Sequence, residues 1–334
     1  MASIVKILLI GLLSLQTYAS THPEVRVALL QFGTVNWEID VIRHHQLDKK
    51  HNFSLNVIPV GSKNASAVAL QSKAVDIIFS DWVWVNRQRF SKRMYSFSPA
   101  SSAAGGLYAQ PDSSITYLHE LEGLRVGVAG GSVDKSWLLL QAFARKEHKL
   151  KLQDYVQPVY VAPPLLNKLM DQGRLPLSLN FWHYSARLKA KGFKPVLKVK
   201  DIVKGLGIQT QVPLVGWVFE DKWKTQNGEL LDNFLKASLE ARQILLNSDE
   251  EWQRIRPLTH AENDEVFNAL KNGYRGGVLQ RFTERELDSL DRLYAIMAAE
   301  GGDALTGGAD LLDRDLFYIP VSEGGVLLGQ GRLK

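Results

Sequence analysis

The order of apolar and helical segments, which occurs twice along the chain, most constrains the fold. In each half, three strand-like apolar runs alternate with two helical patterns. The first set covers, in chain order, residues 25–30, 38–50, 54–60, 65–73 and 75–79. The second set covers residues 124–129, 134–146, 156–161, 165–172 and 177–180. Strands that alternate with helices form mostly parallel sheets with helices on both faces, so the sequence predicts an α/β chain with two similar lobes.

The third strand of each set ends in the same way. In the first set, Ser80, Asp81 and Trp82 follow the strand over residues 75–79. In the second set, Asn180 ends the strand over residues 177–180, and Trp182 comes just after it. In open α/β sheets, ligands lie beyond the carboxyl ends of the strands. Two such edges that face each other would form a cleft between the lobes.

The boundaries of the lobes follow from where the pattern restarts. Residues 24–103 and 214–320 are expected to form lobe 1, because residues 214–219 read as a strand that crosses back and residues 228–300 read as successive amphipathic helices. Residues 104–213 are expected to form lobe 2. The crossing segments near residues 101–110 and 214–219 would be the hinge. Residues 321–334 show no periodicity and are expected to be a loose tail.

The first twenty residues resemble a secretory signal peptide. Lys6 is followed by an apolar run and then by small residues. The chain has no cysteine, so neither disulfides nor an N-terminal lipid anchor are available. We therefore expect a protein that is exported, freed of residues 1–20 and retained in a bacterial periplasm without a lipid anchor.

Charge and motif spacing exclude several classes of function. The formal net charge is only +5, and its lysines and arginines are scattered, so no nucleic-acid groove is expected. No histidine or acidic cluster has the spacing of metal ligands, and no catalytic constellation is visible. The sequence predicts no metal, no cofactor and no catalytic residue.

Five segments resemble the periplasmic solute-binding components of ABC importers. They read FGTVNW (32–37), AVDIIFSDW (74–82), VGVAGGS (126–132), NFWH (180–183) and VGW (215–217). The resemblance is to the nitrate, sulfonate and taurine type, which is related to thiamine-precursor binding proteins. It implies a two-lobed, type II-like binding-protein fold that closes on a small solute about hinge strands. It also implies a monomer that delivers this solute to a permease in the inner membrane and is not an enzyme.

The candidate ligand-binding residues lie at strand ends and helix starts. Aromatic candidates offer flat apolar faces to an organic solute, and glycine, serine and lysine at a helix start could hold an anion. The set comprises Phe32, Thr34, Asn36, Trp37, Lys63, Asn64, Ser80, Asp81, Trp82, Gly131, Ser132, Asp134, Lys135, Asn180, Trp182, His183 and Trp217.

Each of these residues also has a purely structural interpretation. The tryptophans could pack in the lobes, Asn64, Asp81, Ser132 and Asp134 could cap helices, and His183 could pack on its helix. Asp81 favours a cationic solute and Lys135 an anionic one, a conflict that a zwitterion such as an amino-sulfonate would satisfy.

Two other classes of function remain open. An accessory or sensory periplasmic protein of the same fold would bind a protein partner. An enzyme on this fold is the second alternative. The pyrimidine-synthesising enzymes of this fold use a cysteine-rich segment, which this chain does not have.

Overall fold

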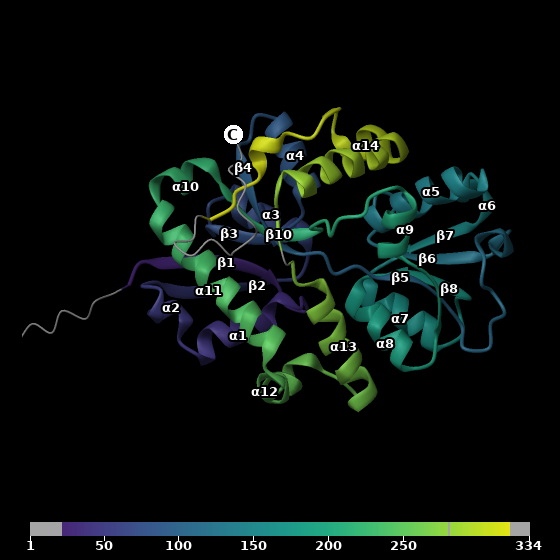
Figure 1. Cartoon of the computed structure of the whole chain (residues 1–334), viewed down its shortest axis with the longest axis horizontal. Helices are drawn as coiled ribbons and strands as arrows, with labels where there is room; N and C mark the ends of the chain where they lie inside the picture. The colour runs from purple at the N-terminus through teal and green to yellow at the C-terminus, as the bar shows by residue number, and fades with distance from the viewer. Residues whose placement is uncertain (1–21, 280, 321–334) are drawn as a thin grey trace, which may run out of the picture.

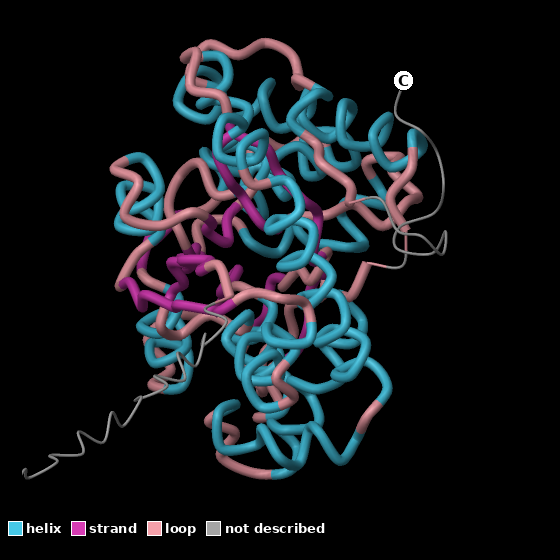
Figure 2. The backbone as a smooth tube through the Cα atoms, turned by 90° about the vertical axis from the view of Figure 1, so that its left-hand side faces the viewer, coloured by secondary structure: helices cyan, strands magenta, loops and turns pink. Residues whose placement is uncertain are grey.

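The computed structural model describes residues 22–279 and 281–320, which form two five-stranded sheets with helices around them (Figures 1 and 2). The predicted signal peptide (1–20) and tail (321–334) lie outside the described residues. The first sheet contains β1 (Glu24–Leu30), β2 (Ser54–Val60), β3 (Ile77–Ser80), β4 (Tyr95–Ser101) and β10 (Val215–Glu220). The second contains β5 (Gly106–Ala109), β6 (Arg125–Ala129), β7 (Gln157–Val161), β8 (Leu177–Asn180) and β9 (Lys194–Lys198).

The two sheets have equivalent topologies. The strand orders are β2-β1-β3-β10-β4 and β7-β6-β8-β5-β9. β1 is parallel to β2 and β3, as β6 is to β7 and β8. β10 and β5 run antiparallel to their neighbours. The sheets are therefore mixed and mostly parallel, as the repeated segments predicted.

Helices cover both faces of each sheet. Lobe 1, which is built on the first sheet, carries α1 (Val35–His44), α2 (Leu47–Lys50), α3 (Lys63–Gln71), α4 (Trp82–Phe90), α10 (Asp221–Gln226), α11 (Gly228–Asn247), α12 (Asp249–Thr259), α13 (Asp264–Gly277), α14 (Glu284–Thr306) and the 3-10 turn Arg314–Leu316. Lobe 2, built on the second sheet, carries α5 (Lys135–His148), α6 (Leu152–Tyr155), α7 (Pro163–Asp171), α8 (Trp182–Ala190), α9 (Val199–Gly205) and the 3-10 turn Leu118–Leu121.

Several local predictions need correction. The helix expected over residues 38–50 begins at Val35 and is interrupted at Gln46, whose φ of 52° is left-handed and ends the helical path. Asn64 does not cap α3. Ser62 does, because its extended backbone lets its hydroxyl accept a hydrogen bond from the Ala65 N–H at 3.1 Å.

The chain crosses between the sheets after β4 and again before β10. The Leu214 N–H donates to Ser101 O at 2.8 Å, so the two crossings are hydrogen-bonded to each other. Ser102 N donates to Gly277 O at 2.9 Å, which ties the first crossing to the end of α13. The two crossings are therefore hydrogen-bonded to each other, and the first is also hydrogen-bonded to the end of α13.

Two helices of lobe 1 pack against lobe 2. α13 packs against α8, and α14 packs against α5 (Figure 1). On this second contact, Arg145 of α5 makes a bidentate pair with Glu300 of α14 at 2.9 and 2.8 Å. Buried side chains, among them Trp82, Leu138 and Tyr294, form one cluster that continues from lobe 1 along α14 into lobe 2.

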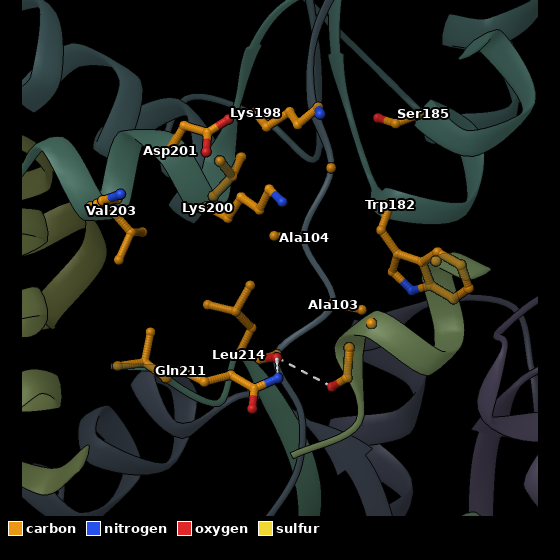
Figure 3. A pocket seen from close by; sticks show the side chains of 18 of the residues that line it. Ala103, Ala104, Trp182, Ser185, Lys198, Lys200, Asp201, Val203, Gln211 and Leu214 are labelled. Carbon is orange, nitrogen blue, oxygen red and sulfur yellow. Dashed lines mark hydrogen bonds between the residues drawn. The ribbon is translucent and has the colours of Figure 1, made fainter. Parts of the chain in front are cut away.

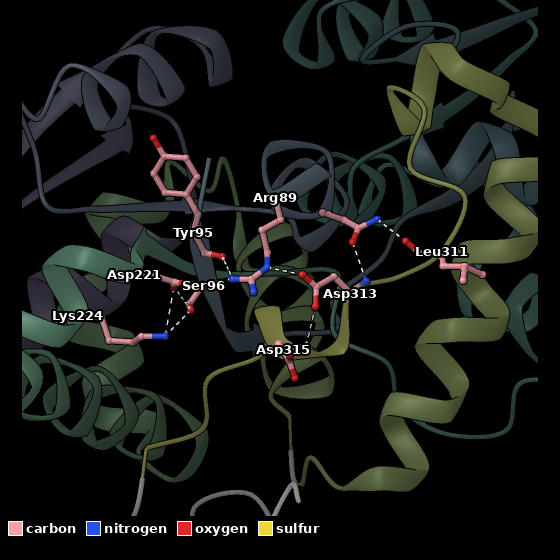
Figure 4. A network of polar contacts seen from close by, with 9 residues as sticks. Arg89, Tyr95, Ser96, Asp221, Lys224, Leu311, Asp313 and Asp315 are labelled. Carbon is pink, nitrogen blue, oxygen red and sulfur yellow. Dashed lines mark hydrogen bonds and ion pairs between the residues drawn. The ribbon is translucent and has the colours of Figure 1, made fainter. Parts of the chain in front are cut away.

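The segment after α14 returns to lobe 1 and is fixed there by Arg89 (Figure 4). The largely buried guanidinium of Arg89 donates to Asp313 at 2.6 Å, Asp221 at 2.8 Å and Tyr95 O at 3.1 Å. Two carboxylates and a carbonyl thus share one cation, which anchors residues near 313 to α4 and β4.

No helix in the described ranges combines the length and the apolar character that a membrane span requires.

Candidate ligand-binding site

An ion pair joins the two lobes. Asp81 follows β3 in lobe 1 and accepts a hydrogen bond from the Trp84 N–H at 3.0 Å, so it caps α4. Its other oxygen lies 3.1 Å from the ammonium of Lys135, the first residue of α5 in lobe 2. Both side chains are largely buried, with 12% and 17% of their surface exposed. The two strand-end loops therefore contact each other directly.

Two further charged side chains, Lys63 and Asp134, interact with this ion pair, so two cations and two anions lie together. Burial alone would raise the pKa of Asp81, but Lys135, Lys63 and the Trp84 N–H together lower it below its usual value. The pKa of Asp134 is raised, chiefly by burial. Burial lowers the pKa of Lys135, yet Asp81 and Asp134 raise it by more. The pKa of Lys63 is lowered, mainly by the charge of Lys135.

A second cross-lobe contact lies beside the ion pair. The Lys63 ammonium of lobe 1 sits 5.4 Å from the centre of the Phe181 ring of lobe 2, within the range of a cation–π interaction. The two lysines and two aspartates together carry no net charge, and their partners are groups of the protein itself. Asp81 and Lys135, which gave opposite expectations for the charge of the solute, are paired with each other in this structure.

A cavity of about 590 Å³ also lies between the lobes, and none of these four charged residues lines it. Lobe 1 contributes the loop after β1 and the face of α1, and lobe 2 contributes α7 and α8. Five of the predicted ligand residues line it: Phe32, Thr34, Asn36, Trp37 and His183. Its volume is within the range of small-molecule sites.

The loop after β1 is held by its own side chains. Asn36 Nδ2 donates to Leu30 O and to Gly33 O, both at 2.8 Å, which fixes the turn into α1. Trp37 is buried and donates from Nε1 to Leu258 O at 3.3 Å. Its ring meets the ring of Trp182 edge-on at 6.0 Å across the lobes. Phe32, in contrast, is 71% exposed at the rim.

His183, one of the residues that line this cavity, has an unpartnered nitrogen. Within the described residues, Nδ1 is buried and has no hydrogen-bond partner. Burial, with a smaller effect of the nearby Arg187, lowers the pKa of His183 to about 3. The imidazole is therefore neutral at physiological pH. A buried polar atom without a partner costs about 1–3 kcal/mol, which a ligand group bonded to it would recover.

Positive charge exceeds negative charge around the cavity. Its lining includes four cationic side chains, Arg43, Lys168, Arg187 and Lys191, and three carboxylates, Asp40, Asp171 and Glu262. The carboxylates are all paired, with Arg254 at 2.5 Å, Lys191 at 2.9 Å and Arg187 at 2.9 Å respectively. Across residues 22–279 and 281–320, Arg43 and Lys168 form no ion pair. One of these two cations comes from each lobe.

Several predicted ligand residues lie elsewhere. Trp82 and Trp217 are completely buried in lobe 1, where their indole N–H groups donate to Pro213 O at 2.9 Å and to Ser238 Oγ at 2.8 Å. Asn180 is buried and donates to Asn167 Oδ1 at 2.8 Å and to Pro163 O at 3.0 Å. None of these three lines the 590 Å³ cavity.

The remaining predicted residues are close to the cleft without lining this cavity. Trp182 faces a different cavity on the opposite side of α8. Asp134 caps α5 by accepting from Ser136 N at 2.9 Å. Ser80 ends β3, Asn64 lies in the first turn of α3, and Gly131 and Ser132 lie in the loop before α5; none of the four lines either cavity.

The cationic side chains that line this cavity were not among the residues predicted from the sequence. Arg187 follows His183 by four positions on α8, which places both on one face of the helix. Lys168 lies on α7 and Arg43 on α1, one turn after Ile39 and Asp40. Helical spacing from His183 and Trp37 could have identified these faces, although only the packing of the lobes brings them together.

No group of three or more histidine, aspartate or glutamate side chains that could hold a metal ion is found in the described part of the chain. The residues that line the cavity offer hydrogen-bonding groups, aromatic surface and positive charge.

Comparison with known proteins shows which solved structures share this fold. No protein-family model and no curated protein matches the chain. Among solved structures, the alkanesulfonate-binding protein SsuA from Xanthomonas axonopodis pv. citri bound to MOPS has a TM-score of 0.68 at 12% identity and covers 88% of this chain and 98% of its own. The aliphatic sulphonate binding protein SsuA from Escherichia coli has a TM-score of 0.64 at 16% identity, covering 80% and 89%.

One structural neighbour is an enzyme. The desulfurization enzyme DSZB has a TM-score of 0.58 at 14% identity and covers 84% of this chain and 92% of its own. Other neighbours include a ligand-binding component of an ABC-type import system from Staphylococcus aureus, with a TM-score of 0.65 at 12% identity, which covers 89% of this chain and 97% of its own. The chain thus has the two-lobed fold of periplasmic binding proteins, as its sequence predicted.

Proposed function

We propose that this chain is the periplasmic solute-binding component of an ABC importer, and that it binds a small organic anion in the 590 Å³ cavity between its lobes and delivers it to a permease. The observation that carries the proposal is the lining of this cavity. It combines a buried, unpartnered His183 nitrogen with one unpaired cation from each lobe. In this role the chain works by binding and catalyses no reaction.

The fold supports a binding function of this type. Proteins that share the architecture over nearly their whole length include two that bind sulfonates. A sulfonate has an apolar tail and a charged head with three acceptor oxygens. Trp37 and Phe32 offer apolar surface to such a tail, while Arg43 and Lys168 can donate to such a head.

The position of the cavity supports capture between lobes. Residues of lobe 1 and lobe 2 face each other across it, so a bound solute contacts both. A solute with this property favours the arrangement in which the lobes are together, because it binds that arrangement better than a separated one. A permease that recognises the closed form could then distinguish loaded from empty protein.

The test is a thermal-unfolding screen of the purified chain with butanesulfonate, taurine, MOPS and nitrate. A compound present at a thousand times its dissociation constant should stabilise the chain by about 4 kcal/mol. We expect butanesulfonate or MOPS to raise the melting temperature, and the rise to shrink strongly in Lys168→Gln and His183→Phe.

Lys222→Gln is the matched control, since Lys222 is an exposed lysine of α10 that lines neither cavity. It should respond to the compounds as the unmodified chain does. If none of the anions changes the melting temperature, or if both cavity variants respond like the control, the chain does not capture an anion in this cavity.

A further inference from the structure

A second and larger cavity, of about 780 Å³, lies on the other side of α8 from the proposed solute cavity. Its walls come from the crossing segments 102–105 and 208–214, from α8 and α9 of lobe 2, and from the end of α13 in lobe 1. Figure 3 shows Lys198, Lys200 and Asp201 on one side of this space and Trp182 on the other. The packing of α8 on α13 separates the two cavities.

We call this space the hinge cavity, because the crossing segments line it. Most of its charged side chains are lysines. Lys189, Lys198, Lys200 and Lys204 line it, and Asp201 is its single carboxylate. In the part of the chain that the structure describes, none of these five side chains takes part in an ion pair. Four like charges around one space repel each other and gain most from an anion with more than one negative charge.

Neutral donors and acceptors line the same space. Within the described ranges, the Thr210 hydroxyl is buried and has no hydrogen-bond partner, although Thr210 lines the cavity. Beside it, Gln211 Nε2 donates to Ser102 Oγ at 2.7 Å, linking the two crossing segments. This unpartnered hydroxyl is an observation independent of the lysines, and a ligand oxygen could accept a hydrogen bond from it.

An aromatic face completes the lining. Trp182 borders the cavity, and its ring lies so close to α13 that a Cβ on Gly273 would be 2.9 Å from it. A glycine at this position lets α13 approach the indole closely. The ring supplies an apolar surface about the width of a small organic ligand, in a space that is otherwise polar.

We propose that the hinge cavity is a second ligand site, and that it takes a small organic polyanion such as a tricarboxylate or a diphosphate. The lysines of α8, β9 and α9 bind the negative groups, and the Thr210 hydroxyl donates to a further oxygen. This site differs from the solute cavity in position and in lining, so the proposal stands independently of the proposed function.

Isothermal titration of the purified chain with citrate and with pyrophosphate, at low salt, tests this site. We expect both to bind, and the double variant K198Q/K200Q to bind at least tenfold more weakly. Thr210→Val removes the hydroxyl with almost no change of shape and should weaken binding several-fold without disturbing the fold. The control K49Q/K222Q removes two exposed lysines outside both cavities and should bind as the unmodified chain does.

Three results would overturn the proposal. Neither probe binds the unmodified chain, or binding falls equally in the control pair, which would mean a diffuse surface effect. In the third, K198Q/K200Q and Thr210→Val bind as before while His183→Phe abolishes binding, which would place the polyanion in the solute cavity. A chain that fails to bind sulfonates yet binds citrate through Lys198 and Lys200 would separate the two proposals.

Discussion

Replacement of His183 by glutamine should remove much of the loss of stability that acid causes. In the folded chain, burial lowers the pKa of His183 to about 3, from 6.5 for the free side chain. Below pH 6.5 the unfolded chain gains a proton that the folded chain does not bind, so folding becomes less favourable as pH falls. The loss is about 1.4 kcal/mol per pH unit, or about 2 kcal/mol at pH 5. Above pH 6.5 this contribution vanishes.

Urea unfolding at pH 7.5 and at pH 5.0 measures the effect, because the difference between the two pH values cancels whatever glutamine itself changes in packing. The unmodified chain should lose about 2 kcal/mol more between the two pH values than His183→Gln does. His148→Gln, which removes an exposed histidine of the same lobe, is the control and should lose as much as the unmodified chain. Equal losses in all three proteins would show that burial does not hold His183 neutral.

Three further changes test other parts of the structure. Tyr274→Phe removes a buried hydroxyl that donates to Glu38 at 3.0 Å and should cost about 1–3 kcal/mol of unfolding free energy in urea; no loss would mean that Glu38 is satisfied without it. Gly273→Ala would place a Cβ 2.9 Å from the Trp182 ring and should cost about 1–3 kcal/mol by overpacking, seen as a lower melting temperature; an unchanged or higher one would contradict this contact between lobes. Asp81→Asn keeps the helix cap but loses the cross-lobe ion pair. Because the pKa of Asp81 is lowered, its stabilisation is present above pH 4 and lost as pH falls further, so the variant should unfold with less pH dependence in that range; an unchanged pH profile would show that the pair adds nothing.

The alternation of strands and helices could be predicted from the sequence because each segment carries its own periodicity. Residues 177–180 were assigned as a strand and form β8. β4 was not predicted, since its sequence YSFSPAS mixes serines and a proline with apolar residues, yet all but its last residue are buried. Such a strand owes its stability to pairing with β10, which is distant in the chain. Local pattern therefore identified the parallel strands better than the antiparallel ones.

Helix caps show the same dependence on local information. Ser248 caps α12 and Thr283 caps α14, each through its side-chain oxygen. Two polar residues stand at the start of α13, where Asn263 accepts the capping hydrogen bond and Asp264 is the first helical residue. A polar residue signals that a helix starts nearby, and the backbone conformation decides which of two neighbours is the cap.

The site was harder to predict because its members come from separate lobes. A tryptophan after a strand can turn toward the cleft or into the core. Trp37 does line the solute cavity, whereas Trp82 is buried in lobe 1. The ion pair of Asp81 with Lys135 joins residues of different lobes and leaves no trace in local spacing. Both outcomes depend on how the lobes pack.

The pairing of charges between the lobes favours an anion over a zwitterion as the proposed solute. A zwitterion needs a free carboxylate for its cationic end, and Asp81 is occupied by Lys135. The three carboxylates around the solute cavity are occupied as well, each by an arginine or lysine within 2.9 Å. An ammonium group would have to break one of these pairs, whereas an anionic head meets Arg43 and Lys168 with no pair to break. Propanesulfonate, which lacks the ammonium group of taurine, should therefore bind more tightly than taurine, and the reverse order would mean that one of the paired carboxylates is released when the solute enters.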